Sequence, residues 1–315
     1  MKKTTFLLLI FFITSATYAQ TVVADIDKFM NEKYPADQPG AAILVAKGDN
    51  IILKKGYGLA SLNPDKPVTA DMVFRIGSIT KQFTSTAILK LAEQGKVDLK
   101  ADITHYLPEF STPGKTVTVE QLLNHTSGIK SYTSLPEAMS KKGLYISPAD
   151  MIKIIQAQPS DFAPNDQWLY NNSGYFLLGM IIEKVSGMTY GEYVTKNLFK
   201  PAGMKSSFTD DSNLPANTAK GYMKSGATEF KVADYVHPSV PYSAGAIFST
   251  VEDLWKWNQT VFKYKLVKKE SLEKAWTPTK LNSGKLVGYG YAWQLARLGD
   301  AKVIGHGGAI DGYLT

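Results

Sequence analysis

The chain has 315 residues, and 35 Lys and Arg against 28 Asp and Glu give it a formal charge of +7 at pH 7. The basic side chains are scattered, and no aromatic-interleaved basic stripe predicts a nucleic-acid groove. The chain has no cysteine, which excludes disulfides, thiolate metal sites and a lipid-anchored cysteine, so core burial must stabilise the fold.

The first 19 residues have the pattern of a secretory signal peptide. Lys2 and Lys3 precede an apolar run over residues 6–13, and small residues lead to a cleavage site after Ala19. This run is too short to span a bilayer, and no other segment reaches the required length. We therefore expect an exported mature chain of 296 residues (315 − 19), periplasmic or secreted, with no integral membrane segment.

The mature chain shows strand patterns near both ends and helical patterns in its middle. Turn residues at 48–50 join the first two strands into a hairpin, and residues 101–240 are mostly helical and irregular. The expected helices cover residues 22–33, 81–94 and 251–261, and the expected strands cover 41–46, 51–53, 288–295, 303–305 and 312–315. This order predicts an α+β fold in which distant segments close one antiparallel sheet around a helical insertion.

Ser78 and Lys81 lie one helical turn apart, where the helix over residues 81–94 begins. A desolvated lysine can remove the proton of a serine hydroxyl and make it a nucleophile. Ser-x-x-Lys also occurs at Ser127 and at Ser271, but Ser271 lies in a charged run and Ser127 precedes a glycine turn. Position therefore favours Ser78 as the catalytic serine.

Tyr170-Asn171-Asn172 contains the one Tyr-x-Asn of the sequence. A phenol can relay a proton, and Asn172 could bond both a substrate amide and a lysine amine. The alternative is a packed loop tyrosine followed by two asparagines that serve a turn and cap the next helix.

His306-Gly307-Gly308 follows an apolar strand, and its glycines would allow a ligand backbone to approach closely. The alternative is a histidine at a strand end beside a glycine turn. The four histidines lie far apart, without the close spacing of metal ligands, so we expect neither a metal site nor another cofactor.

Ser-x-x-Lys, a polar motif ending in Asn, and a histidine followed by glycines occur here in the chain order typical of serine penicillin-recognising enzymes. The sequence resembles the superfamily of class C β-lactamases, serine D-Ala-D-Ala carboxypeptidases and family VIII-type esterases. The resemblance rests on the three motifs and on residues 73–78, 122–129, 170–175 and 243–250. It implies one β-lactamase/transpeptidase-like catalytic domain over residues 20–315, with an α/β lobe (about 20–85 and 245–315) and a helical lobe (about 86–244).

The resemblance also implies a role for each motif residue. Ser78 would be acylated, Lys81 would take its proton, and Tyr170 would pass a proton to the leaving group. Asn172 would bond Lys81 and the substrate amide, and the backbone N–H groups of Ser78 and Ala309 would form the oxyanion hole. His306, Gly307 and Gly308 would line the substrate site. For Lys81 to act near neutral pH, its pKa must fall from about 10.4 to about 7.

Two departures from the family pattern bear on substrate and on length. Many members have lysine where this chain has His306, and a neutral histidine would weaken recognition of carboxylates and favour neutral esters or amides. The family also continues past the point where this sequence ends, at Thr315, with further strand and a helix. We therefore expect a fragment of a longer protein or an incomplete gene model.

Other functions fit the sequence less well. No Gly-x-Ser-x-Gly elbow supports an α/β-hydrolase, and no phosphate loop supports a nucleotide enzyme. The main prediction is an exported serine hydrolase for a small-molecule or peptide substrate: a β-lactam, a D-Ala-D-Ala-type peptide or a small ester. The alternative is a sensor or scaffold that binds penicillins or cell-wall peptides with little turnover. The sequence gives no indication of the oligomeric state.

Overall fold

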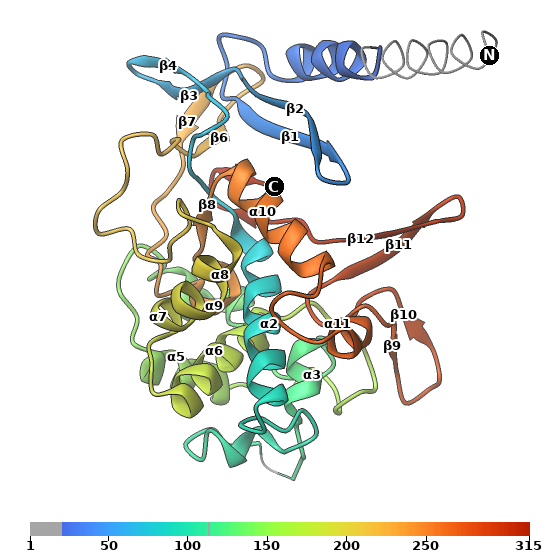
Figure 1. Cartoon of the computed structure of the whole chain (residues 1–315). Coiled ribbons are helices and arrows are strands. Elements are labelled where there is room, and N and C mark those ends of the chain that lie inside the picture. Colours follow the sequence, from blue (N-terminus) through green and yellow to red (C-terminus); the bar gives the residue numbers. More distant parts are fainter. Residues whose placement is uncertain (1–20, 113) are drawn as a thin grey trace, which may run out of the picture.

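A computed structural model of the chain describes residues 21–112 and 114–315, so the predicted signal peptide lies outside the described residues. The structure combines helices with short antiparallel strand pairs, which confirms the predicted α+β class. Helices from the middle of the chain surround α2, while β1–β2 and β11–β12 lie at the periphery (Figure 1). The division into two lobes stays a prediction.

Residues 21–33 form the first helix, as expected. The α-helices that follow are α2 (Thr80–Glu93), α3 (Val119–Leu123), α4 (Pro136–Met139), α5 (Pro148–Gln156), α6 (Asn172–Ser186), α7 (Tyr190–Val194), α8 (Lys200–Ala202), α9 (Tyr242–Gly245), α10 (Val251–Phe262) and α11 (Lys269–Ala275). Short helical turns of other types are η1 (Gly77–Ile79), η2 (Ile103–His105), η3 (Tyr132–Ser134) and η4 (Thr195–Phe199).

The strands pair within hairpins or across short bridges. They are β1 (Ala41–Lys47), β2 (Asn50–Tyr57), β3 (Leu59–Leu62), β4 (Asp65–Pro67), β5 (Phe74–Arg75), β6 (Tyr222–Lys224), β7 (Phe230–Val232), β8 (Phe248–Ser249), β9 (Thr279–Lys280), β10 (Leu286–Val287), β11 (Gln294–Leu298), β12 (Ala301–Gly305), β13 (Ala309–Ile310) and β14 (Tyr313–Leu314). The predicted hairpin at the start of the chain is confirmed, since β1 pairs with β2 in antiparallel register.

The expectation of one closed sheet is wrong for the described residues, where seven separate two-stranded ladders form. β1 pairs with β2 and β12 with β11, so strands from the two ends of the chain do not pair with each other. A groove of about 850 Å³ lies between β1, α10 and residues 309–315. A strand pattern shows which residues are extended but not which partner they bond, because any exposed edge offers the same backbone groups.

The strand expected over residues 288–295 is also wrong, because regular pairing with β12 begins only at Gln294. The N–H of Gly290 donates to the carbonyl of Trp293 at 2.8 Å and closes a turn. Ala292 lies between them with φ at 68°, which is incompatible with an extended strand. Aromatic residues on both sides of the turn are buried, which gave this segment its strand-like composition.

Helix α2 is the centre of the fold and is buried around its whole circumference. Its polar side chains reach the backbone of distant segments: Thr84 donates to the carbonyl of Ser243 at 2.6 Å, and Ser85 to that of Tyr291 at 3.0 Å. Such bonds offset the cost of burying hydroxyl groups. They also fix the rotation of α2, and therefore the direction in which Lys81 projects.

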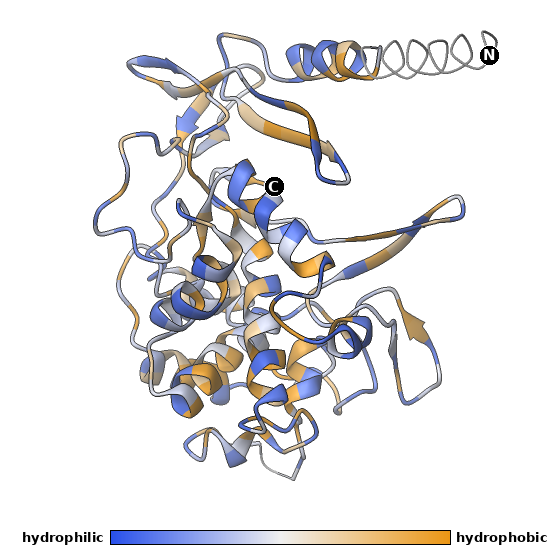
Figure 2. Ribbon diagram, in the orientation of Figure 1, coloured by the Kyte–Doolittle hydropathy of each residue, from blue (hydrophilic) through white to orange (hydrophobic). Residues whose placement is uncertain are grey.

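An aromatic stack joins α2 to α10. The ring of Phe83 is fully buried and lies 4.0 Å, centroid to centroid, from the stacked ring of Trp257. Figure 2 shows hydrophobic and hydrophilic residues alternating along the helices that surround α2. Within residues 21–112 and 114–315, no helix combines the length and the apolar composition needed to cross a membrane.

We predict that Phe83→Ala lowers the free energy of unfolding by about 3–5 kcal/mol, because it removes a fully buried ring and leaves a cavity beside Trp257. Phe29→Ala is the control, since the ring of Phe29 is 57% exposed. Denaturant titration measures both. Equal small losses for the two variants would contradict the central position of α2.

Candidate active site

Ser78 lies in η1, the tight turn that leads directly into α2. Gly77 before it has φ at +50°, and a Cβ at Gly77 would lie 2.9 Å from the backbone nitrogen and oxygen of Ala309. Glycine is required here for both reasons. N–H groups in the first turn of a helix have no partner within the helix, so the N–H of Ser78 is left to bond a group outside it.

Lys81 has no exposed surface, and its Nζ contacts three oxygen atoms. Ser78 Oγ is at 3.1 Å, Asn172 Oδ1 at 2.8 Å and the carbonyl oxygen of Ala244 at 2.8 Å. The three partners come from η1, α6 and α9, so the amine lies where three elements meet. Burial lowers the pKa of Lys81 well below 10.5.

Tyr170 covers this amine with its ring, whose centroid is 4.8 Å from Lys81 Nζ. Its hydroxyl is buried and has no hydrogen-bond partner of normal geometry among the described residues. Burial raises the pKa of Tyr170, and the hydroxyl of Ser78 acts in the opposite direction. The phenol is therefore protonated at neutral pH, close to the serine and free to bond another group.

Asn172 opens α6 and faces the amine because Asn171 caps the helix. Asn171 Oδ1 accepts from the N–H of Gly174 at 2.8 Å, which is typical of a helix N-cap. Asn172 Nδ2 donates to Thr133 Oγ1 at 3.1 Å, and this bond turns Oδ1 toward Lys81. The capping role expected for the alternative reading thus belongs to Asn171, while Asn172 contacts Lys81.

Ala309 begins β13 and faces the Ser78 turn. Gly308 and Thr315 exchange two backbone hydrogen bonds, of 2.9 and 2.8 Å. The next pair, Ala309 with Leu314, is then of the non-hydrogen-bonded kind, because the two kinds alternate along an antiparallel ladder. The N–H of Ala309 consequently points away from β14, toward the side on which Gly77 lies.

His306 follows β12, and both of its ring nitrogens are already engaged. Nδ1 lies 2.6 Å from the carbonyl oxygen of Gly307, and Nε2 lies 2.9 Å from the hydroxyl of Tyr289. Burial lowers the pKa of His306 to about 4, and Lys81 acts in the same direction, while the carbonyl of Gly307 opposes them. The imidazole is therefore neutral at pH 7.

Gly308 makes its close approach to the chain itself. A Cβ at this position would lie 2.0 Å from the carbonyl oxygen of Ile76. The glycine thus lets the strand that carries Ala309 pack against the turn that carries Ser78. Gly307 has more room, since its nearest neighbour would be the carbonyl oxygen of Thr315 at 3.2 Å.

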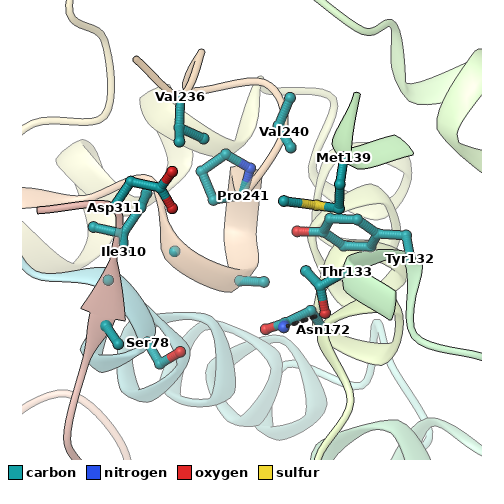
Figure 3. A pocket seen from close by; sticks show the side chains of 14 residues that line it. Ser78, Tyr132, Thr133, Met139, Asn172, Val236, Val240, Pro241, Ile310 and Asp311 are labelled. Carbon is teal, nitrogen blue, oxygen red and sulfur yellow. Dashed lines mark hydrogen bonds between the residues drawn. The ribbon is translucent and has the colours of Figure 1, made fainter. Parts of the chain in front are cut away.

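A pocket of about 140 Å³ opens above Ser78 (Figure 3). Asn172 and Thr133 lie on one side of it, and Ile310 and Asp311 on the other, with apolar side chains above. Its remaining lining residues are Gly77, Tyr132, Met139, Val236, Val240, Pro241, Ala244, Gly245 and Ala309. The structure thus brings Ser78, Lys81, Tyr170, Asn172 and Ala309 together, while His306, Gly307 and Gly308 are not among the residues that line this pocket.

The two other Ser-x-x-Lys matches have no such arrangement. Ser271 Oγ donates to Glu93 at 2.6 Å, while Lys274 pairs with Glu120. Ser127 Oγ accepts from the N–H of Ile129, and Lys130 pairs with Asp161 at 2.6 Å. In the described part of the chain neither lysine contacts its serine, so among the three motifs only that of Ser78 brings a base within reach.

The sequence pattern of the Beta-lactamase family matches residues 26–315. The chain belongs to the Beta-lactamase family. It is similar to penicillin-binding protein 4* of Bacillus subtilis, with 29% identity over 272 residues that cover 82% of this chain and 60% of the relative. The chain therefore spans about three fifths of the length of that curated relative.

Two solved structures share the fold. A D-stereospecific amidohydrolase from Streptomyces sp. matches with a TM-score of 0.77 and 29% identity, covering 90% of this chain and 86% of the other. An octameric penicillin-binding protein homologue from Pyrococcus abyssi matches with a TM-score of 0.78 and 28% identity, covering 93% and 68%. These likenesses confirm the β-lactamase/transpeptidase-like fold.

Sequence reasoning missed several residues of the site. Asp311 places a carboxylate in the pocket wall, where it pairs with Lys142 at 2.5 Å, and Lys142 also pairs with Asp234 at 3.1 Å. The only signal was proximity to Gly308 in the sequence. Tyr132 and Thr133 belong to a helical turn with no recognisable motif. Among the described residues, no group of three or more His, Asp or Glu side chains could hold a metal ion.

We predict that Gly308→Ala lowers activity by ~10-fold or more and stability by about 1–3 kcal/mol, because the added methyl would push β13 away from the Ser78 turn. Gly305→Ala is a matched control three residues earlier, since a Cβ there would meet no atom within 4 Å. Steady-state kinetics and thermal unfolding measure both. Full activity in Gly308→Ala would refute the role of this close approach.

Proposed function

We propose that the protein is an exported serine hydrolase that cleaves an amide or ester through an acyl-enzyme on Ser78. The observation that carries the proposal is the set of three contacts around Lys81 Nζ. Two of the three partners, Asn172 Oδ1 and the carbonyl oxygen of Ala244, can only accept hydrogen bonds. They therefore determine which way a neutral amine must turn.

A neutral lysine amine has two hydrogens and one lone pair. Both hydrogens are committed to the two acceptors, so the lone pair is directed at the hydroxyl of Ser78, 3.1 Å away. The lowered pKa of Lys81 makes this neutral form accessible. These observations support Lys81 as the general base that removes the serine proton.

The reaction then follows from the surrounding groups. Ser78 Oγ bonds to the substrate carbonyl carbon as its proton moves to Lys81 Nζ. The N–H groups of Ser78 and Ala309 stabilise the negative oxygen that forms. As the bond to the leaving group breaks, the hydroxyl of Tyr170 supplies the proton that the leaving amine or alcohol needs, and Lys81 returns one to Tyr170. Deacylation runs these proton transfers in reverse. Water bonds to the acyl carbon and gives a proton to Tyr170 while Tyr170 passes its own to Lys81, and Lys81 then returns a proton to Ser78 Oγ as the acyl bond breaks.

Several observations bear on the substrate, which we infer to be a β-lactam, a D-Ala-D-Ala-type peptide or a small ester. Relatives named as penicillin-binding proteins and as a D-stereospecific amidohydrolase support acyl donors of these kinds. The pocket holds only about 140 Å³, which favours a small acyl group. A neutral His306 and the carboxylate of Asp311 both disfavour a substrate carboxylate, and so favour neutral amides or esters.

We predict that a fluorophosphonate or a fluorescent penicillin labels the protein and that Ser78→Ala abolishes the labelling, because the reagent bonds to the nucleophilic oxygen. Ser271→Ala is the matched control, because Ser271 also begins a Ser-x-x-Lys sequence but bonds Glu93 instead of its lysine, and it should label as the wild type does. Gel fluorescence over time measures the label. Label that turns over indicates an enzyme, and stable label with no ester or amide hydrolysis indicates the sensor alternative. No labelling would refute the proposal.

The pH dependence tests Lys81. The neutral amine exists above the pKa of Lys81, so kcat/KM for a neutral ester should rise through that pKa and level off well below pH 10.5. Lys81→Arg should remove activity at every pH, because a guanidinium stays protonated. Lys274→Arg, in the other motif, should retain it. A rate that still rises in proportion to hydroxide above about pH 9 would contradict this role.

A further inference from the structure

Four hydrogen bonds run in a line through side chains that the proposed mechanism does not use. The N–H of Asn171 lies 3.2 Å from His125 Nδ1, and His125 Nε2 lies 3.0 Å from the hydroxyl of Tyr289. The same hydroxyl lies 2.9 Å from His306 Nε2, and His306 Nδ1 lies 2.6 Å from the carbonyl oxygen of Gly307. His125 is 1% exposed and Tyr289 is 2% exposed.

The two ends of this line fix the protons within it. An amide N–H can only donate, so His125 Nδ1 accepts, and the proton of a neutral His125 lies on Nε2, directed at the oxygen of Tyr289. A carbonyl can only accept, so His306 Nδ1 carries a proton. Tyr289 then receives one hydrogen bond from His125 and has its own proton to donate to His306 Nε2.

One other arrangement satisfies the same contacts. Tyr175 donates its proton to the carbonyl oxygen of Leu123 at 2.6 Å, so its oxygen could accept from Tyr289. In that arrangement His306 would be a cation and would donate to Tyr289. The surroundings decide between the two states.

The titratable groups that face the two imidazoles come from every packed element: Lys81 on α2, Tyr170 before α6, Tyr175 on α6, and Tyr289. A charged Lys81 would repel an imidazolium and a neutral one supplies no negative charge to stabilise it. The three phenols are neutral because burial raises the pKa of each. Burial lowers the pKa of both histidines. The neutral arrangement is therefore the stable one.

His125 shows a further sign of constraint. Its φ is +64°, in the left-handed region that non-glycine residues rarely adopt. Such a backbone is kept where the surrounding contacts over-determine it, and sites of this kind cluster where geometry matters for function. Here the conformation directs the ring between Asn171 and Tyr289.

We propose that Tyr289 and His125 are positioning residues that hold His306 as the neutral Nδ1–H tautomer, so that the end of β12 offers the substrate no cation. The inference rests on the proposed function and deepens it, because it names the substrate class: acyl donors that place no carboxylate beside His306. The line also joins the segment from Tyr170 to the start of α6 to the strand that precedes Ala309.

Nitrogen-15 NMR of the histidine-labelled protein tests the proposal directly. The chain has four histidines, and single substitutions of His105, His125, His237 and His306 assign their signals. We expect His306 to show a proton on Nδ1 and none on Nε2 from about pH 6 to 8. Protonation of both nitrogens, or an Nε2–H tautomer, would overturn the proposal. The tautomer itself is read from the wild type, and this measurement needs no active enzyme.

Tyr289→Phe should release His306. We expect the Nδ1–H tautomer to be lost and the imidazole to become protonated at a higher pH than in the wild type. Tyr193→Phe is a matched control, since Tyr193 is buried and its hydroxyl has no partner among the described residues. An unchanged His306 signal in folded Tyr289→Phe would overturn the role of Tyr289.

Kinetics with two esters that differ only in a carboxylate or a carboxamide provide the second measurement. In Tyr289→Phe, the ratio of kcat/KM for the carboxylate over the carboxamide ester should increase ~3–10-fold between about pH 8 and pH 6. The wild type and Tyr193→Phe should show a constant ratio, and a constant ratio in Tyr289→Phe would count against the specificity role. If the wild type hydrolyses neither ester, the proposed function fails while the tautomer measurement still decides the assignment.

Discussion

The burial of Lys81 without a counter-charge is the constraint on which the rest of the structure depends. An ammonium that is removed from water is costly unless acceptors surround it or it loses its proton. Here Ser78, Asn172 and Ala244 provide three oxygen atoms at 3.1, 2.8 and 2.8 Å, and none of them carries a negative charge. The environment tolerates the cation but favours the neutral amine.

Assembling those acceptors requires segments far apart in the chain to meet on one helix. Hydroxyl groups of α2 bond to the backbone beyond residue 240, and Asn171 caps α6 so that Asn172 reaches the amine. Gly77 and Gly308 bring the last strand pair against the Ser78 turn. The close packing of α2 with α6 and α9 is thus the means by which a chemical site is built.

Local features of the sequence were sufficient to predict much of this. The spacing of Ser78 and Lys81, the β1–β2 hairpin and the helices α2 and α10 depend on residues a few positions apart, and each was found from its pattern. The family resemblance favoured the catalytic roles of Tyr170 and Asn172 over the turn alternative and added Ala309. The structure places Tyr170 and Asn172 at the amine and Ala309 beside the Ser78 turn.

Features that depend on distant partners were not predictable in the same way. His125 and Tyr289 are 164 residues apart in the chain, and nothing in either neighbourhood indicates that they bond. The turn at Ala292 was mistaken for a strand because buried aromatic residues give turns and strands the same composition. Partner choice between strand edges is likewise invisible to a single sequence.

Localising the acyl group by mass spectrometry tests the central claim most directly. The protein would be mixed with a slowly deacylating ester or penicillin, quenched in acid and digested. The account predicts the added mass of one acyl group on the peptide that contains Ser78, and its absence in Ser78→Ala. An acyl group on another residue, or rapid substrate consumption with no acylated peptide at any time, would contradict it.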